Sequence, residues 1–179
     1  MAVYQRQPGH NNIAIGMDCL VIALALYTDQ LAQARDQINQ LTKGRIDSQI
    51  EPDGRLPHEL ERTLSFSYSI KALNSFFIAA RLAEHVGIDL WNYEGPDGQS
   101  IRKGLDFLIP YCYEPEKWPY PQIKDLISQP AGIVRHLLPL AIRAWPEEAY
   151  KNTYGHISRK GVAKEEWLIY CGLLLKEGK

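Results

Sequence analysis

Cysteine is scarce in this chain, and its spacing excludes the sites that cysteine usually builds. Cys19, Cys112 and Cys171 are far apart and odd in number, with no Cys-x-x-Cys pair. The pattern indicates neither a zinc site nor a disulfide framework, so we interpret the three as small buried side chains. The histidines show no metal-ligand spacing either. Motifs for nucleotide, phosphate or calcium binding and for a Gly-x-Ser-x-Gly nucleophile are absent. The sequence therefore predicts no metal and no cofactor.

An excess of charge of one sign is also missing. The chain has 20 Lys and Arg against 21 Asp and Glu, a formal net charge of −1, so no global field attracts nucleic acid or an anionic membrane. The longest apolar run, Met17 to Tyr27, is interrupted by Asp18 and is shorter than the about 20 residues that span a bilayer. Only Arg6 precedes this run and no clear cleavage site follows it. We interpret it as a buried helix and see no signal peptide.

Alternating strand patterns of useful length are lacking too, whereas apolar residues recur at three- and four-residue spacing. We expect an all-α protein with one domain over residues 1–179 and an irregular arm over 1–12. Thr28 and Asp29 predict the N-cap of the second helix. Pro139 predicts a kink, and residues 147–160 are polar enough to predict an irregular segment with a short helix at its start. Predicted helices cover 16–28, 29–44 with a restart to 50, 63–85, 100–109, 131–145 and 164–175.

Residues 49–69 form the most informative segment of the chain. A Pro52-Asp53-Gly54 turn leads into a helix that carries Arg62 and Tyr68, six residues apart. A cation beside a phenol lowers the pKa of the phenol, which can then transfer protons near neutral pH. A regular helix would turn by about 600° between the two, placing them about 120° apart. A long Arg side chain or an irregular first turn could bring them together.

These residue types suit β-elimination of a uronic acid. The reaction removes the proton at C5, neutralises the carboxylate and protonates the leaving O4. A phenol can transfer the proton, and a guanidinium or the amides of Asn11 and Asn12 can bind the carboxylate. The alternative is structural: Tyr68 as a core residue with its hydroxyl at a polar rim, and Arg62 paired with Glu59.

Several blocks of the chain resemble the alginate lyase superfamily of polysaccharide lyases. Residues 49–69 follow the pattern Gln-Ile-x-Pro-Asp-Gly-x-x-Pro-x-Glu-Leu-x-Arg-Thr-x-Ser-x-x-Tyr-Ser. Further blocks occur in the same order at residues 11–12, 87–91, 96–98, 105–108 and 117–123. The resemblance implies an (α/α) toroid built of antiparallel helix pairs, here incomplete because the N-terminal helices of the family are lacking.

By this resemblance, Tyr68 matches the family's proton donor, which also serves as base, Arg62 matches its catalytic Arg, and Asn12 matches an Asn that neutralises the carboxylate. The family's catalytic His, which follows the Asn pair, falls on Ile13. The alternatives are therefore an acidic-glycan-binding remnant without catalysis, or a helical interaction module. Further expected substrate-binding residues are Asn11, His10, His58, Trp118 and Tyr120.

The resemblance also implies the partners and the compartment. An acidic polysaccharide of alginate or glucuronan type is the expected substrate, cleaved without a metal. A second copy of the chain is expected to cover the apolar surface that a half-toroid exposes. Such lyases are periplasmic or secreted, so we expect the same location here.

Overall fold

The structure is a computed structural model that describes residues 9, 11–124, 126 and 130–159. Within these residues the regular secondary structure is helical, and Leu64 and Gln122 form an isolated antiparallel bridge in place of any strand. The predicted all-α class is confirmed. Most of the expected arm over 1–12 and the whole of the expected helix over 164–175 lie outside the described residues.

The helical elements differ from the predicted ones mainly at their ends. Thr28 and Asp29 do not cap the second helix, since Thr28 ends the first and Asp29 takes a positive φ of 57° between the two. In chain order the elements are α1 (Asn12–Tyr27), α2 (Leu31–Gln37), the π-helix η1 (Ile38–Thr42), α3 (Lys43–Gln49), α4 (Pro57–Leu60), α5 (Ser65–Glu84), α6 (Ile101–Leu108), α7 (Pro110–Tyr113), the 3-10 turn η2 (Pro115–Lys117), α8 (Pro130–Gly132), the π-helix η4 (Ile133–Leu137), α9 (Leu138–Ala144) and α10 (Glu148–Arg159).

The segment predicted as irregular over 147–160 is the helix α10, so that prediction was wrong. Tyr150, Thr153 and Ile157 are buried at helical spacing. The rest of the segment is polar, and a stripe of three residues was too narrow to be recognised. Pro110 likewise opens α7 where we expected a helix to end, because proline is tolerated in the first turn of a helix.

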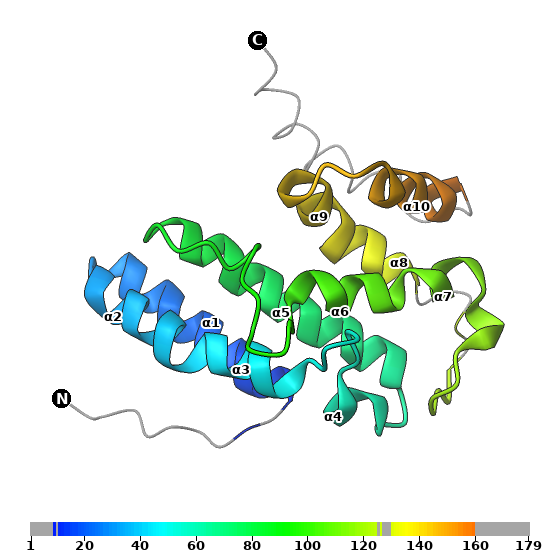
Figure 1. Cartoon of the computed structure of the whole chain (residues 1–179), viewed down its shortest axis with the longest axis horizontal. Coiled ribbons are helices and arrows are strands. Elements are labelled where there is room, and N and C mark those ends of the chain that lie inside the picture. Colours follow the sequence, from blue (N-terminus) through cyan, green and yellow to red (C-terminus); the bar gives the residue numbers. More distant parts are fainter. Residues whose placement is uncertain (1–8, 10, 125, 127–129, 160–179) are drawn as a thin grey trace, which may run out of the picture.

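The helices α1 and α5 run in the same direction and pack directly on each other, and the segment α2, η1 and α3, which connects them in the chain, runs back in the opposite direction beside α1 (Figure 1). The Cys19 Sγ donates a hydrogen bond to the Ser75 carbonyl at 3.1 Å, across a separation of 56 residues. Asn12 and Tyr68 have the same separation of 56, so the first turns of the two helices lie side by side. This parallel register brings together two parts of the chain that the sequence keeps far apart.

The helix α5 lies at the centre of the core. Its predicted apolar face is buried, including Phe66, Leu73 and Phe77. The turn that leads to α4 is held against α6, where Gly54 has a φ of 90° and its backbone lies so close to the Lys103 carbonyl that a side chain would collide with it. The position of α4 is therefore fixed from both ends, by this turn and by α5.

Candidate functional site

Arg62 lies in the turn between α4 and α5, outside both helices, and this places it on the ring of Tyr68. Its guanidinium carbon is 3.5 Å from the centre of the phenol ring. The separation of about 120° that a regular helix would impose does not apply, because only Tyr68 belongs to α5. The structure thus brings the two predicted residues into direct contact, at a geometry typical of cation–π stacking.

A second cation faces the same ring. Lys71, one turn further along α5, has its Nζ 4.9 Å from the ring centre. Tyr68 itself is half-buried, so the phenol is fixed by its neighbours while part of it stays in contact with solvent. A negative charge that develops on or beside this phenol would be stabilised by both cations.

Asn12 completes this group from the start of α1. The Arg62 Nη1 donates to the Asn12 Oδ1 at 3.5 Å, and Asn11 caps the helix by accepting the Ile13 N–H at 3.1 Å. Both asparagines are half-buried. We call the group of Asn12, Arg62, Tyr68 and Lys71 the cationic site.

Glu59 lies beneath the cationic site and was missed as a site residue by the sequence reasoning, which noted it only as a pairing partner of Arg62. It is 2% exposed. Its Oε1 accepts the Asn12 N–H at 2.6 Å, and its Oε2 lies 3.7 Å from the Arg62 Nη1. Burial raises the pKa of the Glu59 carboxyl, and the Asn12 N–H and Arg62 oppose that rise. One buried carboxylate therefore positions both Asn12 and Arg62.

The residue beside this group, Ile13, is 65% exposed at the first turn of α1. An isoleucine can neither accept a proton nor donate a hydrogen bond from its side chain. The position that the resemblance assigns to a catalytic His is thus accessible to solvent but chemically inert.

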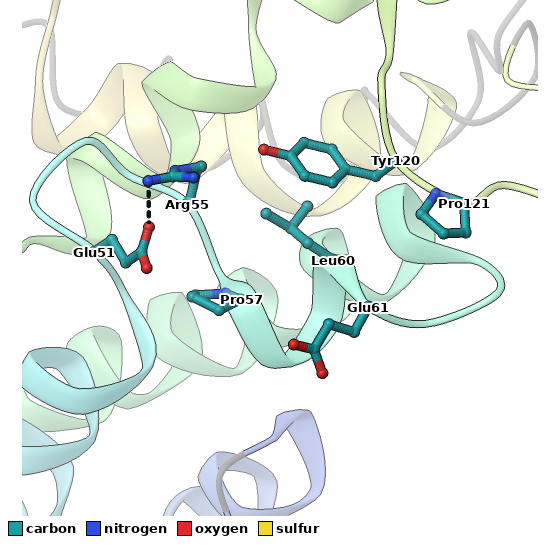
Figure 2. Close-up of a pocket in the computed structure, with 7 residues that line it drawn as sticks. All are labelled: Glu51, Arg55, Pro57, Leu60, Glu61, Tyr120 and Pro121. Carbon is teal, nitrogen blue, oxygen red and sulfur yellow. Dashed lines mark ion pairs between the residues drawn. The ribbon is translucent and has the colours of Figure 1, made fainter.

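A pocket of about 440 Å³ is lined by residues 51–61, the part of the 49–69 segment that precedes Arg62 (Figure 2). Figure 2 shows the Tyr120 ring above Leu60 with its hydroxyl directed toward Arg55. Arg55 is paired with Glu51 at 2.8 Å and with Asp53 at 2.7 Å, and Asp53, followed by the Tyr120 hydroxyl and Glu51, raises the pKa of its guanidinium. We call this cavity the Tyr120 pocket; its lining is Glu51, Arg55, Pro57, Leu60, Glu61, Tyr120 and Pro121.

The expectation that Trp118 stacks on a sugar is wrong, because the side chain is only 8% exposed. Its Nε1 donates to the Ser65 Oγ at 2.8 Å, and its ring makes edge contacts with Phe66 at 4.9 Å and Tyr120 at 5.0 Å. Trp118 therefore supports Tyr120 from behind. Tyr120 is half-buried and lines the pocket.

The two predicted histidines have different outcomes. His10 lies outside the described residues. His58 is exposed on α4. It opposes the rise in the pKa of the neighbouring Glu59 carboxyl, but by less than Asn12 and Arg62 do. It does not line the Tyr120 pocket.

The described part of the chain contains no group of three or more His, Cys, Asp or Glu side chains suited to a metal ion. Its helices are also too short or too polar to cross a bilayer.

Comparisons with known proteins bear on the family and the fold of the chain. A family model described as alginate lyase matches residues 1–118, about two-thirds of the 179 residues. This chain belongs to the alginate lyase family. No curated protein matches it. The crystal structure of an alginate lyase from Bacteroides ovatus is similar with a TM-score of 0.84 and 33% identity, over 93% of this chain and 44% of that chain.

The alginate lyase similarity confirms the predicted family and the (α/α) toroid class. The chain spans less than half the length of the similar alginate lyase. The toroid is therefore represented here in part, by the helix pairs around α1 and α5.

Proposed function

We propose that this protein is a polysaccharide lyase that cleaves a uronate-containing acidic glycan of alginate or glucuronan type by β-elimination. The observation that carries the proposal is the stacking of Arg62 on Tyr68 at 3.5 Å, beside Asn12. Family membership supports the same reaction type. The roles of the individual residues follow from their chemistry.

In the proposed reaction, Arg62 and the Asn12 amide bind the uronate carboxylate. This binding withdraws charge from C5 and stabilises the carbanion that forms when the C5 proton leaves. Tyr68 is the proton-transferring group: its oxygen takes the C5 proton and returns one to the leaving O4. The C4–O4 bond breaks as the C4–C5 double bond forms, so the products are a 4,5-unsaturated uronate and a new hydroxyl end.

The test is the ultraviolet absorbance of the unsaturated product on alginate and on glucuronan. Tyr68→Phe removes the phenol oxygen and keeps the ring on which Arg62 stacks, so we expect the rate to fall about 100-fold or more. Tyr27→Phe is the matched control, because Tyr27 is 89% exposed at the far end of α1. If the two variants were equally active, Tyr68 would have no catalytic role.

The second candidate is a glycan-binding protein without catalysis, and the exposed Ile13 in place of a His favours it. In that case wild-type protein would produce no absorbance on either glycan. Calorimetry would still detect binding of uronate oligosaccharides, and Arg62→Ala would abolish that binding. If neither cleavage nor binding were measurable, the third candidate, a helical interaction module, would be supported.

We further propose a second copy of this chain as a partner. Leu20, Leu24 and Tyr27 are large apolar side chains exposed along α1, and a row of this kind is typical of an interface. Light scattering should report a dimer, and Leu20→Glu with Leu24→Glu should convert it to a monomer. A monomeric wild-type protein would exclude this partner.

We also propose a periplasmic or secreted location, the one expected from the resemblance. Cell fractionation with an antibody against the chain tests it. Recovery in the cytoplasmic fraction would refute the proposal.

A further inference from the structure

The net charge of the cationic site depends on Lys71. The buried Glu59 carboxylate lies 3.7 Å from the Arg62 Nη1, and its negative charge offsets the positive charge of the guanidinium. Among the residues that the structure describes, no acid forms an ion pair with Lys71. The positive charge that a ligand meets at this site therefore comes mainly from the Lys71 ammonium group.

The Lys71 ammonium lies where a ligand can reach it. The side chain is exposed on α5, and its Nζ is 4.9 Å from the centre of the Tyr68 ring. The guanidinium carbon of Arg62 is 3.5 Å from the same centre, so a carboxylate at the edge of this ring can approach both cations. Burial raises the pKa of the Glu59 carboxyl, and Lys71 is among the groups that oppose this rise. The charge of Lys71 therefore acts across the site as well as on the ring.

A second lysine–tyrosine pair, Lys43 and Tyr93, makes the same kind of contact in a structural role. The Lys43 Nζ is 5.2 Å from the centre of the Tyr93 ring. The Tyr93 hydroxyl lies 3.1 Å from each Asp47 carboxylate oxygen and donates to this carboxylate, so the phenol is already engaged by the protein. In the described part of the chain, the Tyr68 hydroxyl has no such hydrogen-bond partner. The pair of Tyr68 and Lys71 therefore leaves both its phenol and its cation available to a ligand.

A carboxylate that gains charge during a reaction suits this arrangement. When the C5 proton leaves a uronate, the electron pair of the C–H bond delocalises into the carboxylate, whose negative charge increases. A cation beside this group then stabilises the transition state more than the bound substrate. The exposed Ile13 side chain has no donor to offer, whereas the Lys71 ammonium is a donor with a full charge.

We propose that Lys71 is a further catalytic residue, which binds the carboxylate of the reacting uronate together with Arg62 and Asn12. This rests on the proposed function and adds to it a role for Lys71. Arg62 orients the carboxylate through its planar fork, and Lys71 supplies the net positive charge that stabilises it. Without Lys71 the site would hold one cation and one buried acid, and its attraction for an anion would be weak.

Binding is tested by calorimetry with an alginate tetrasaccharide on the full chain carrying Tyr68→Phe, so that nothing is cleaved during the measurement. Adding Lys71→Gln removes the charge of an exposed side chain, so folding should be preserved. We expect the affinity to fall about fivefold, the upper end for an exposed ion pair, and Lys71→Arg to restore most of it. Lys43→Gln is the matched control, because it removes the lysine from the other tyrosine ring. It should leave the affinity unchanged.

Catalysis is tested by the rate of formation of the unsaturated product with Tyr68 intact. We expect Lys71→Gln to lower kcat about tenfold in addition to the loss of affinity, because the carboxylate carries more charge in the transition state than in the bound substrate. Lys43→Gln should leave kcat unchanged. A lysine that only supported the helix would change neither kcat nor the affinity.

The proposal is overturned if Lys71→Gln and Lys43→Gln behave alike, if Lys71→Arg binds no better than Lys71→Gln, or if kcat is unchanged in Lys71→Gln. Failure of the proposed function is distinguishable from these results. A wild-type protein that cleaves neither glycan but binds uronates in a Lys71-dependent way would refute the lyase and retain the carboxylate contact. Cleavage that requires Tyr68 but not Lys71 would retain the lyase and refute the role of Lys71.

Discussion

The cationic site and the Tyr120 pocket are built by the same short segment and have opposite electrostatic character. Each contains an arginine that has at least one glutamate beside it. At the cationic site the acid is Glu59, which is buried, and Arg62 and Lys71 both remain on the ring of Tyr68. In the pocket the guanidinium of Arg55 is shared between two carboxylates. The presence of an arginine alone therefore does not identify a site for a ligand anion. Whether the guanidinium is already paired with carboxylates of the protein determines whether it can bind one.

The largest expected effect comes from removing the guanidinium of the cationic site. Arg62→Met keeps an apolar side chain near Tyr68 but cannot bind a carboxylate. We expect the rate of formation of the unsaturated product to fall about 100-fold, as for the loss of one charge-stabilising donor.

Arg55→Met makes the same change in the pocket and sharpens the comparison. Because Arg55 is already engaged by Glu51 and Asp53, we expect the rate to fall by less than about fivefold. Equal losses in the two variants would show that both arginines bind the reacting uronate.

The next effect in size is a gain. Ile13→His places an imidazole at the exposed first turn of α1, where the resemblance expects the family's catalytic His. A positioned general base contributes about 100-fold or more in enzymes, and an unoptimised one should raise the rate about tenfold.

Ile78→His is the control for this gain, because Ile78 is also an exposed isoleucine, on α5 and outside the proposed interface. It should leave the rate unchanged. A similar response of both variants would mean that the imidazole acts from solution and that the Ile13 position has no special relation to Tyr68.

The sequence was sufficient for the class of fold and for the central helix, and it was insufficient where the chain departs from regular geometry. The apolar repeat of α5 is long, so its ends were placed within two residues. The contact of Arg62 with Tyr68 depends on a turn that ends just before Ser65, and periodicity does not describe turns.

Two site features could not be predicted because they depend on the approach of distant segments. Asn12 meets Glu59 only because α1 and α5 run parallel with their first turns side by side. The Tyr120 pocket forms where the loop after η2 returns to α4, fixed by a hydrogen bond from the Ser65 N–H to the Pro121 carbonyl at 3.1 Å. From their residue types alone, Trp118 and Tyr120 were equally good candidates for substrate binding. The structure distinguishes them, because Trp118 is buried and Tyr120 lines the pocket.

A smaller effect is expected on stability, from Glu59→Gln. The pKa of the Glu59 carboxyl is raised by burial, so the folded state binds this proton more tightly than the unfolded state. The contribution of Glu59 to the free energy of unfolding is therefore full below its ordinary pKa of 4.5 and is lost as the pH rises through the raised pKa.

Glutamine keeps the acceptor for the Asn12 N–H and removes the titration. We expect wild type to lose about 1 kcal/mol relative to Glu59→Gln between pH 4 and pH 7, measured by urea unfolding at several pH values. Asp18, whose pKa burial also raises, cancels in this difference. A gap between the two proteins that does not change with pH would contradict the assignment.

The smallest expected effect is that of Tyr120→Phe, and it tests how the pocket keeps its arginine engaged. The change removes the hydroxyl that is directed toward Arg55 and keeps the ring that packs on Trp118. Arg55 then has one polar neighbour fewer and becomes more available to a carboxylate. We expect the affinity for an alginate tetrasaccharide, measured by calorimetry, to rise about twofold, the effect of one weak polar contact.

Tyr111→Phe is the control for Tyr120→Phe, because Tyr111 packs on the same Trp118 at 4.8 Å and does not line the pocket. It should leave the affinity for the alginate tetrasaccharide unchanged. If Tyr120→Phe also left this affinity unchanged, the engagement of Arg55 would rest on Glu51 and Asp53 alone. The selectivity of the pocket would then depend on its acids rather than on its aromatic wall, because those acids would both repel a uronate and hold the arginine away from it.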